Sequence, residues 1–412
     1  MTTRLSRAIA HVFLRRIRAG SLTIVEDGRR LTFGEGAPAA TVYVRSPRAW
    51  RKLLRGSNGL AEAYARRLWD SPDLTRVVRV AARNAGGLDR LRSSLAPLLV
   101  PLQRVRGLLS RNTRSRRRRD IAAHYDLGND LFELMLDPTM TYSCALFERP
   151  EMTLQQAAVA KLERVCEKLE LRPSDHVLEI GSGWGAFALY AARTRGCRVT
   201  TTTISLEQHR YASDQARRAG LEDRVEVLLE DYRDLRGSYD KLVSIEMIEA
   251  VGWQHFDTFF GRCSELLKPE GAMLLQAIAI EDRAYEVEKA SRSFMNTYIF
   301  PNGCLPSMRV IGRSVKRRTD MAVADVEDIT DHYVLTLRHW RVNFERNAER
   351  LAALGYDERF RRIWRLYLAY CEAGFIERRI RDVQLVLTKP GRAAHLSSSL
   401  ANEPVLRGAA VG

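Results

Sequence analysis

The sequence has no long hydrophobic run, few aromatic residues and no paired cysteines. In its 412 residues the longest apolar stretch runs from Ala96 to Leu102 and contains two prolines, whereas a transmembrane helix needs about 18 or more apolar residues in succession. The six cysteines form no CxxC pair, so the pattern suggests neither a zinc site nor a redox pair. The N-terminus lacks the apolar core and cleavage site of a secretory signal. We therefore expect a cytoplasmic protein with free thiols.

Acidic residues are scarce in the first quarter of the chain. Residues 1–119 contain 27 Lys and Arg against 7 Asp and Glu, a net charge of +20, whereas residues 120–412 carry −4. The overall composition, with 45% hydrophobic and 28% charged residues, is that of a folded protein. A basic excess confined to one region predicts a polyanionic partner there, either a nucleic acid or an anionic membrane surface.

The N-terminal region has the pattern of a small basic α+β domain over residues 1–85. Its first 18 residues place apolar side chains at helical spacing between arginines, which predicts an amphipathic helix. A strand-like stretch then breaks at Asp27-Gly28, as in a hairpin. Residues 86–119 follow as an Arg-rich linker, and we expect its last four arginines, Arg116–Arg119, to bind an anionic surface.

From residue 120 to residue 395 the pattern changes to strands that alternate with helices, which is typical of a parallel sheet with helices on both faces. Strands are expected at His176–Ile180, Arg198–Ile204, Val225–Leu229, Lys241–Ile245, Met273–Ile280 and Val383–Leu387. The segment 281–320 interrupts this order and is expected to be an insertion, and residues 396–412 form a tail.

A glycine-rich turn follows the first of these strands, from Glu179 to Ala186. Glycines let the backbone approach a ligand closely, and the next helix offers its N-terminal amides. Gly181, Gly183 and Ala186 match the dinucleotide fingerprint, but that fingerprint also needs an acidic residue at the end of the second strand. Here that strand ends in TTTIS at 201–205, without a carboxylate. This absence argues against NAD.

The E-x-G-x-G-x-G form of the turn resembles the S-adenosylmethionine (SAM) site of class I methyltransferases. The resemblance implies a Rossmann-like, seven-stranded α/β fold with SAM as cofactor. The residues that it assigns to the cofactor come from the glycine turn, the end of the second strand, the turn after the third strand and a segment before the core. They are Tyr142, Ser143, Glu179, Gly181, Gly183, Gly185, Thr203, Gln208, Asp231 and Tyr232.

Several further segments, in order along the chain, resemble the cyclopropane-fatty-acid synthases. They are HYDLGND at 124–130, MTYSCA at 140–145, EAVG at 249–252, YIFP at 298–301, and His332-Tyr333 with Trp340. The motif GLAEAY at 59–64 resembles the lipid-associated N-terminal domain of the longer bacterial members. The resemblance covers nearly the whole chain, and the ordered set is more specific than any single motif.

This family resemblance implies that the SAM methyl group is transferred to a cis double bond of a phospholipid acyl chain. A base then removes a proton, which gives a cyclopropane or, after a hydride shift, a methylene or methyl branch. In the family the base is a bound bicarbonate. The positions implied to hold it are Cys144, Glu249, Gln276, the backbone amide of Ile278, and Tyr333. Gln276 is a departure, because many members have His there.

Other residues and partners follow from the same resemblance. Glu246 lies three residues before Glu249, so either carboxylate could face the pocket. Phe294, Tyr298 and Phe300 are expected to line an acyl channel within the insertion. The expected partners are an unsaturated phospholipid, the anionic inner face of the membrane, a second copy of the chain, and a separate reductase if the product is a methylene lipid. We expect no nucleic-acid partner and no metal.

Three alternatives share parts of this pattern. A nucleic-acid methyltransferase would use the same cofactor turn and the basic N-terminus, but the sequence has neither an Asn-Pro-Pro-Tyr type motif nor a Pro-Cys motif. A small-molecule N-methyltransferase would share the core but has no need of the basic N-terminal domain. A lipid-binding protein without activity would have no need of the glycine turn together with Cys144, Glu249 and Tyr333.

Overall fold

The computed structural model describes residues 2–85, 128–290, 293–301 and 303–392. The expected linker at 86–119 with its Arg116–Arg119 run, the tail at 396–412 and the first four residues of HYDLGND lie outside the described residues.

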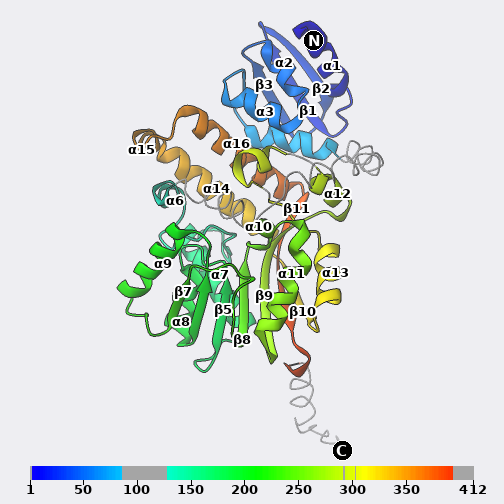
Figure 1. Ribbon diagram of the computed structural model, residues 1–412. Coiled ribbons are helices and arrows are strands. Elements are labelled where there is room, and N and C mark those ends of the chain that lie inside the picture. The colour runs from blue at the N-terminus through cyan, green and yellow to red at the C-terminus, as the bar shows by residue number, and fades with distance from the viewer. Residues whose placement is uncertain (1, 86–127, 291–292, 302, 393–412) are drawn as a thin grey trace, which may run out of the picture.

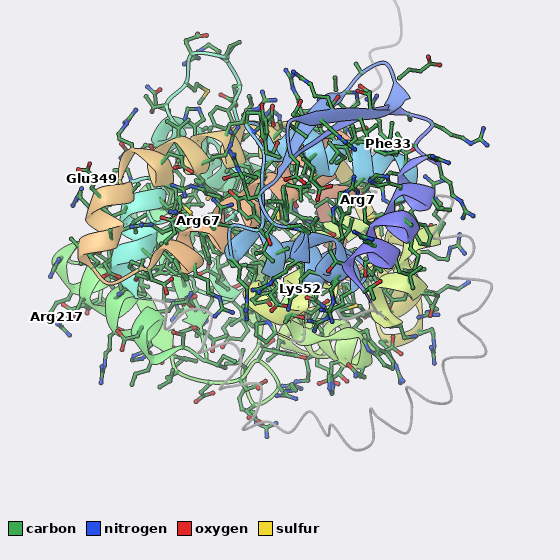
Figure 2. All side chains as sticks on the ribbon, turned by 90° about the horizontal axis from the view of Figure 1, so that it is seen from above. Arg7, Phe33, Lys52, Arg67, Arg217 and Glu349 are labelled. Carbon is green, nitrogen blue, oxygen red and sulfur yellow. The ribbon has the colours of Figure 1, made fainter. Side chains whose placement is uncertain are left out.

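The N-terminal domain is a four-stranded sheet with helices packed against it (Figure 1). Its sheet has the order β2-β1-β3-β4, and the hairpin expected at Asp27-Gly28 is formed by antiparallel β1 and β2. The elements are α1 (Thr3–Leu14), β1 (Gly20–Glu26), β2 (Arg29–Glu35), β3 (Ala39–Val44), α2 (Arg48–Leu53), α3 (Gly56–Ala65) and β4 (Trp69–Asp70). Figure 2 looks onto this domain from above and labels Arg7 of α1, whose guanidinium lies 3.3 Å from the carboxylate of Glu26 on β1.

The second sheet has seven strands in the order β10-β11-β9-β8-β5-β6-β7, and helices cover both of its faces (Figure 1). Its strands are β5 (His176–Ile180), β6 (Arg198–Thr202), β7 (Val225–Leu228), β8 (Tyr239–Ile245), β9 (Leu267–Ile280), β10 (Ala322–Asp328) and β11 (Ile380–Thr388). The helices against it are α7 (Leu154–Lys168), α8 (Ala186–Arg195), α9 (Leu206–Arg218) and α11 (Phe256–Leu266). The predicted fold class is confirmed.

The parallel strand direction expected for the sheet is wrong at one edge. Strand β11 pairs antiparallel with both β9 and β10, and β10 itself was not expected. The side chains of β10 are almost all exposed, and its seven residues are four Ala or Val and three Asp or Glu. A strand that buries so little has no continuous apolar pattern to reveal it. The consequence is that β11 brings residues from the end of the chain beside β9.

A layer of helices lies between this sheet and the N-terminal domain (Figure 1). The elements outside the sheet core are α6 (Asn129–Met135), α10 (Ile248–Val251), a 3-10 turn (Trp253–His255), α12 (Asp282–Ala290), a π-helical turn (Met295–Ile299), α13 (Met308–Arg318), α14 (Thr330–Arg346), α15 (Ala348–Ala353) and α16 (Glu358–Ile376). The buried side chains of the N-terminal domain, α6, α14 and α16 form one continuous cluster. The expected insertion 281–320 therefore contains α12, the π-helical turn and α13.

Arg362 joins the N-terminal domain to α16. Its guanidinium lies 3.8 Å from the ring centre of Tyr64, its Nε donates to the Tyr64 carbonyl at 2.7 Å, and its Nη2 donates to the Trp69 carbonyl at 3.3 Å. The side chain is almost fully buried. Within the described part of the chain, no helix has the length and apolar character to cross a membrane.

Candidate active site

A pocket opens at the carboxyl ends of β5, β6 and β8, which is where parallel α/β sheets bind their ligands. The glycine turn forms one wall of it. Gly181 has φ +99°, and a Cβ there would meet the Met247 side chain at 3.0 Å, so only glycine fits this close approach. Gly183 has φ +50°, and a Cβ there would meet no atom within 4 Å. The turn therefore exposes its backbone to the pocket.

Nine of the ten residues predicted to bind the cofactor line this pocket. They are Tyr142, Ser143, Glu179, Gly181, Gly183, Thr203, Gln208, Asp231 and Tyr232. The tenth, Gly185, does not line it. A Cβ at Gly185 would lie 3.1 Å from the Cβ of Ala212, so this glycine allows α8 to pack closely on α9. The lining set suits SAM, because open backbone at the glycine turn meets acidic and amide side chains that can hold its polar groups.

Two carboxylates of the cofactor set have different environments. Asp231 accepts hydrogen bonds from the Nε of Arg233 at 2.7 Å and from the Arg233 backbone N–H at 3.1 Å. Glu179 is buried and accepts a 2.6 Å hydrogen bond from the Thr201 hydroxyl. Burial raises the pKa of Glu179 to about 8.

The carboxylate of Glu246 receives three hydrogen bonds at the inner end of the pocket. The backbone N–H of Cys144 and Nε2 of Gln276 each donate to Oε1 at 2.8 Å, and the Tyr333 hydroxyl donates to Oε2 at 2.5 Å. Glu246 lines the pocket, whereas Cys144, Gln276 and Tyr333 lie behind it. A strand, a helix and a loop far apart in sequence thus converge on one acid.

Glu246 adopts a backbone conformation that few side chains tolerate. Its φ is +49°, in the left-handed region that costs a residue with a Cβ roughly 1–2 kcal/mol. Its backbone N–H donates to the Gln276 carbonyl at 2.8 Å, which holds the turn in this form. A strained backbone that carries a partly buried acid with three hydrogen bonds indicates a functional side chain.

The predicted catalytic residues meet, but around Glu246 rather than Glu249. Cys144 contributes its backbone N–H, while its thiol points to the carbonyls of Ala145 and Ile329. Glu249 accepts a 2.6 Å hydrogen bond from the backbone N–H of Ile278, and it does not line the pocket.

A bound bicarbonate does not fit this arrangement. The donors expected to hold it, at Cys144, Gln276 and Tyr333, already donate to Glu246. The N–H of Ile278 already donates to Glu249. A carboxylate of the chain occupies the position that the resemblance implied for bicarbonate.

Three carboxyl groups lie together here. Burial raises the pKa of Glu246, and burial with repulsion from Glu246 raises the pKa of Glu249 to about 8. Asp382 of β11 is fully buried, and burial followed by repulsion from Glu246 and Glu249 raises its pKa well above the ordinary range. Nε2 of Gln276 bridges Glu246 and Asp382, at 2.8 Å and 3.1 Å.

Sequence reasoning missed Asp382, Gln384 and Lys161. Gln384 lies opposite Gln276 in the β9–β11 pairing and donates to its side-chain carbonyl at 3.1 Å, which turns the Gln276 amide nitrogen toward the acids. The only available signal was the pair of polar residues in the apolar strand DVQLVL, at 382–387. Lys161 lies on α7 among apolar residues and donates to the Ser143 hydroxyl at 3.0 Å.

Aromatic rings surround the acid cluster. Tyr333 stacks on Phe375 with ring centres 4.4 Å apart, and meets Trp340 edge-on at 6.0 Å. The hydroxyl groups of Tyr142 and Tyr367 are 2.7 Å apart. Such rings present electron-rich faces that stabilise a nearby cation.

The residues expected to line an acyl channel form two ring contacts beside this cluster. Phe294 is buried and lies 6.0 Å from Tyr298, which is partly exposed, and Phe300 lies 5.9 Å from Tyr367. The contact of Phe300 with Tyr367 connects the insertion to α16. Among the residues that the structure describes, no group of three or more side chains has the composition of a metal site.

Comparison with known proteins identifies the family. The model of the mycolic acid cyclopropane synthetase family matches residues 112–385. The chain belongs to this family. It is 37% identical to the tuberculostearic acid methyltransferase UfaA1 of Mycobacterium tuberculosis over 397 residues, which cover 94% of this chain and 92% of that protein. It is 38% identical to the cyclopropane-fatty-acyl-phospholipid synthase of Escherichia coli K12 over 353 residues, covering 85% and 87%.

Solved structures of the family agree with the fold. The mycolic acid cyclopropane synthase CmaA1, complexed with S-adenosylhomocysteine (SAH) and CTAB, is 31% identical, with a TM-score of 0.62 over 66% of this chain and 98% of that one. The cyclopropane synthase MmaA2 of M. tuberculosis gives the same TM-score at 30% identity, again over 66% of this chain and 98% of that one. Membership of this family makes the chain a SAM-dependent methyltransferase. The nucleic-acid and small-molecule alternatives are not favoured.

Proposed function

We propose that this enzyme transfers the SAM methyl group to the cis double bond of an unsaturated acyl chain in a phospholipid. Proton loss then gives a cyclopropane or a methylene-branched chain, and the second product would need a separate reductase to become a methyl branch. The observation that carries the proposal is the Glu246 carboxylate, which accepts three hydrogen bonds and lines the cofactor pocket beside aromatic side chains. The relatives' names, which refer to fatty acids, mycolates and phospholipids, support the lipid substrate.

An alkene is a weak nucleophile, so the protein contributes by positioning it and by excluding water. Bound SAM supplies an electrophilic methyl group. The alkene π electrons would form the new C–C bond to this methyl group as the methyl–sulfur bond breaks and S-adenosylhomocysteine leaves, and the second alkene carbon would become cationic. The ring faces of Tyr333 and its neighbours stabilise this charge.

Glu246 then removes a proton from the cationic lipid. If the proton comes from the new methyl group, its C–H electrons close a three-membered ring. If a hydride first shifts from the methylated carbon, loss of a methyl proton leaves a C=CH2 branch. In either case the proton is held on a Glu246 oxygen until the products leave. Because bicarbonate does not fit, the proposed base is this side chain.

The proposed location is the inner face of the membrane, with the N-terminal domain as the contact. Helix α1 exposes about half of the surface of Leu5, Val12 and Phe13, and the Arg16 guanidinium lies 5.7 Å from the Phe13 ring centre. Apolar side chains beside arginines are what an anionic lipid surface binds. A second copy of the chain is kept as a proposed partner on the family resemblance alone.

The test is to express the protein in a bacterium rich in cis-monounsaturated phospholipids that is fed methyl-labelled methionine. Fatty acids are then analysed by gas chromatography with mass spectrometry. We expect labelled chains that have gained one carbon, and retention time separates cyclopropane from methylene products. Glu246→Gln should reduce the labelled product by at least about a hundredfold, because general-base catalysis contributes 10²–10⁴-fold.

The matched control is Glu163→Gln, which alters an acid on α7 paired with Arg195 away from the pocket and should leave the labelled product unchanged. Folded wild-type protein that binds SAM but labels no lipid would contradict the proposal. Full activity of Glu246→Gln would contradict the assignment of the base.

A further inference from the structure

Among the residues that the structure describes, one buried cation lies with the acids of this site. Lys161 is 1% exposed, lines the cofactor pocket together with Glu179 and Glu246, and its Nζ donates to the Ser143 hydroxyl at 3.0 Å. The next residue, Cys144, donates its backbone N–H to Glu246. The ammonium group therefore binds Ser143, and the residue next to Ser143 in the same loop donates directly to Glu246.

Burying an ammonium group is costly, and this one makes a single hydrogen bond to a neutral partner among the described residues. The groups that can compensate it, when ionised, are the acids around it. Burial lowers the pKa of Lys161, whereas Glu246, Cys144, Glu179 and Asp382 act in the opposite direction. By the same attraction Lys161 lowers the pKa of Glu246 against the effect of burial.

We propose that Lys161 is a positioning residue of this site, whose buried ammonium group keeps Glu246 ionised and so ready to accept the proton. The inference rests on the proposed function, because it takes Glu246 to be the base. Other groups that face Glu246 do not supply this charge. They are Cys144, Glu249, Tyr333, Tyr367, Cys371 and Asp382, and each is neutral or negative. Lys161 is thus the compensating charge among the groups described.

The test compares Lys161→Met with Lys241→Met in the full-length protein. Lys241 is the matched control: it too is buried, but its Nζ donates to the Leu169 carbonyl at 2.7 Å, away from the acids. The rate of methyl transfer to phospholipid vesicles is measured against pH. Removing the nearby positive charge should shift the acidic limb of the kcat–pH profile to higher pH by about one unit or more. Lys241→Met should leave this limb at the wild-type pH.

A second readout needs no lipid. The carboxyl band of Glu246 is followed in the infrared as a function of pH, and is assigned by its loss in Glu246→Gln. We expect Lys161→Met to shift this titration upward and Lys161→Arg, which keeps the charge, to restore it. If only the proposed function is wrong, the wild-type protein makes no methylated lipid, but Lys161→Met still shifts the titration of Glu246.

The inference itself is overturned if the Glu246 titration does not move in Lys161→Met. It is also overturned if that variant loses SAM affinity with an unchanged pH profile, because Lys161 would then bind the cofactor rather than set the charge of the base. A melting temperature within a few degrees of the wild type shows that the variant is folded. If Lys161→Met does not fold, an upward shift in Lys161→Gln supports the inference and its absence overturns it.

Discussion

At the scale of single residues, Glu246 combines a strained backbone with a buried charge. Glycine adopts φ +49° at little cost, whereas a residue with a Cβ is strained there. The chain nevertheless has a glutamate at this position. This is the physical reason that the sequence alone did not identify the proposed base. Glu246 and Glu249 lie on the same turn, and it is Glu246, with its positive φ, that lines the pocket.

This geometry predicts the behaviour of Glu246→Gly. The substitution relieves the backbone strain and leaves a space lined by the donors at Cys144, Gln276 and Tyr333. We expect the variant to be inactive in bicarbonate-depleted buffer and to regain methyl transfer as bicarbonate is added, because a small carboxylate-like anion satisfies the same donors.

The control for this prediction is Glu246→Gln, which fills the space and should show no such recovery. Rates are measured with labelled SAM and phospholipid vesicles over a bicarbonate titration. An inactive Glu246→Gly at every bicarbonate concentration would contradict the prediction, as would full activity without the anion.

At the scale of elements, the hydrophobic pattern predicted the central strands well. The strand His176–Ile180 was predicted with its exact bounds, and β6, β7, β8 and β9 were placed correctly although their ends differ. The hydrophobic pattern did not predict strands whose side chains are exposed, nor the direction of a strand. β10 is exposed, and the antiparallel direction of β11 depends on the long α14–α16 connection rather than on any local signal.

The contact between α16 and the N-terminal domain predicts a large effect of one arginine. Arg362→Leu removes the guanidinium donor to the carbonyls of Tyr64 and Trp69, of which the Tyr64 carbonyl keeps the Arg67 backbone N–H at 3.0 Å. A hydrogen bond from a charged group contributes about 1.5–3 kcal/mol. We expect the free energy of unfolding to fall by about 2–4 kcal/mol in urea denaturation followed by tryptophan fluorescence.

Arg365 supplies the control on the same helix. It pairs with Glu345 nearer the surface, where an ion pair contributes about 0–1 kcal/mol. An equal decrease in the free energy of unfolding for Arg365→Leu and Arg362→Leu would show that the buried Arg362 contact does not stabilise the packing of α16 on the N-terminal domain.

At the scale of the whole molecule, the buried acids predict how stability depends on pH. Glu179 and Glu249 have folded-state pKa values of about 8, whereas in the unfolded chain a glutamate has a pKa of about 4.3. The folded protein therefore binds more protons than the unfolded chain between these values, and stability falls as the pH rises through this window.

We expect the melting temperature of the protein without SAM to decrease between pH 5.5 and pH 8.5. Glu179→Gln and Glu249→Gln should each flatten this decrease, because the amide stays neutral. Glu163→Gln should not, since hydrogen bonds from Tyr190 and Arg195 lower the pKa of Glu163 and move its effect below this range. A melting temperature that rises over the same interval would contradict the raised pKa values.

The place of β11 in the sheet also has a consequence for the order of events during synthesis. Asp382 and Gln384 lie opposite Ile278 and Gln276 of β9, yet they are separated from them by about a hundred residues of chain. On the ribosome the glycine turn emerges early, long before the strand that orients Gln276 toward Glu246. The nascent chain therefore cannot complete the hydrogen bonds around Glu246 until β11 has left the exit tunnel.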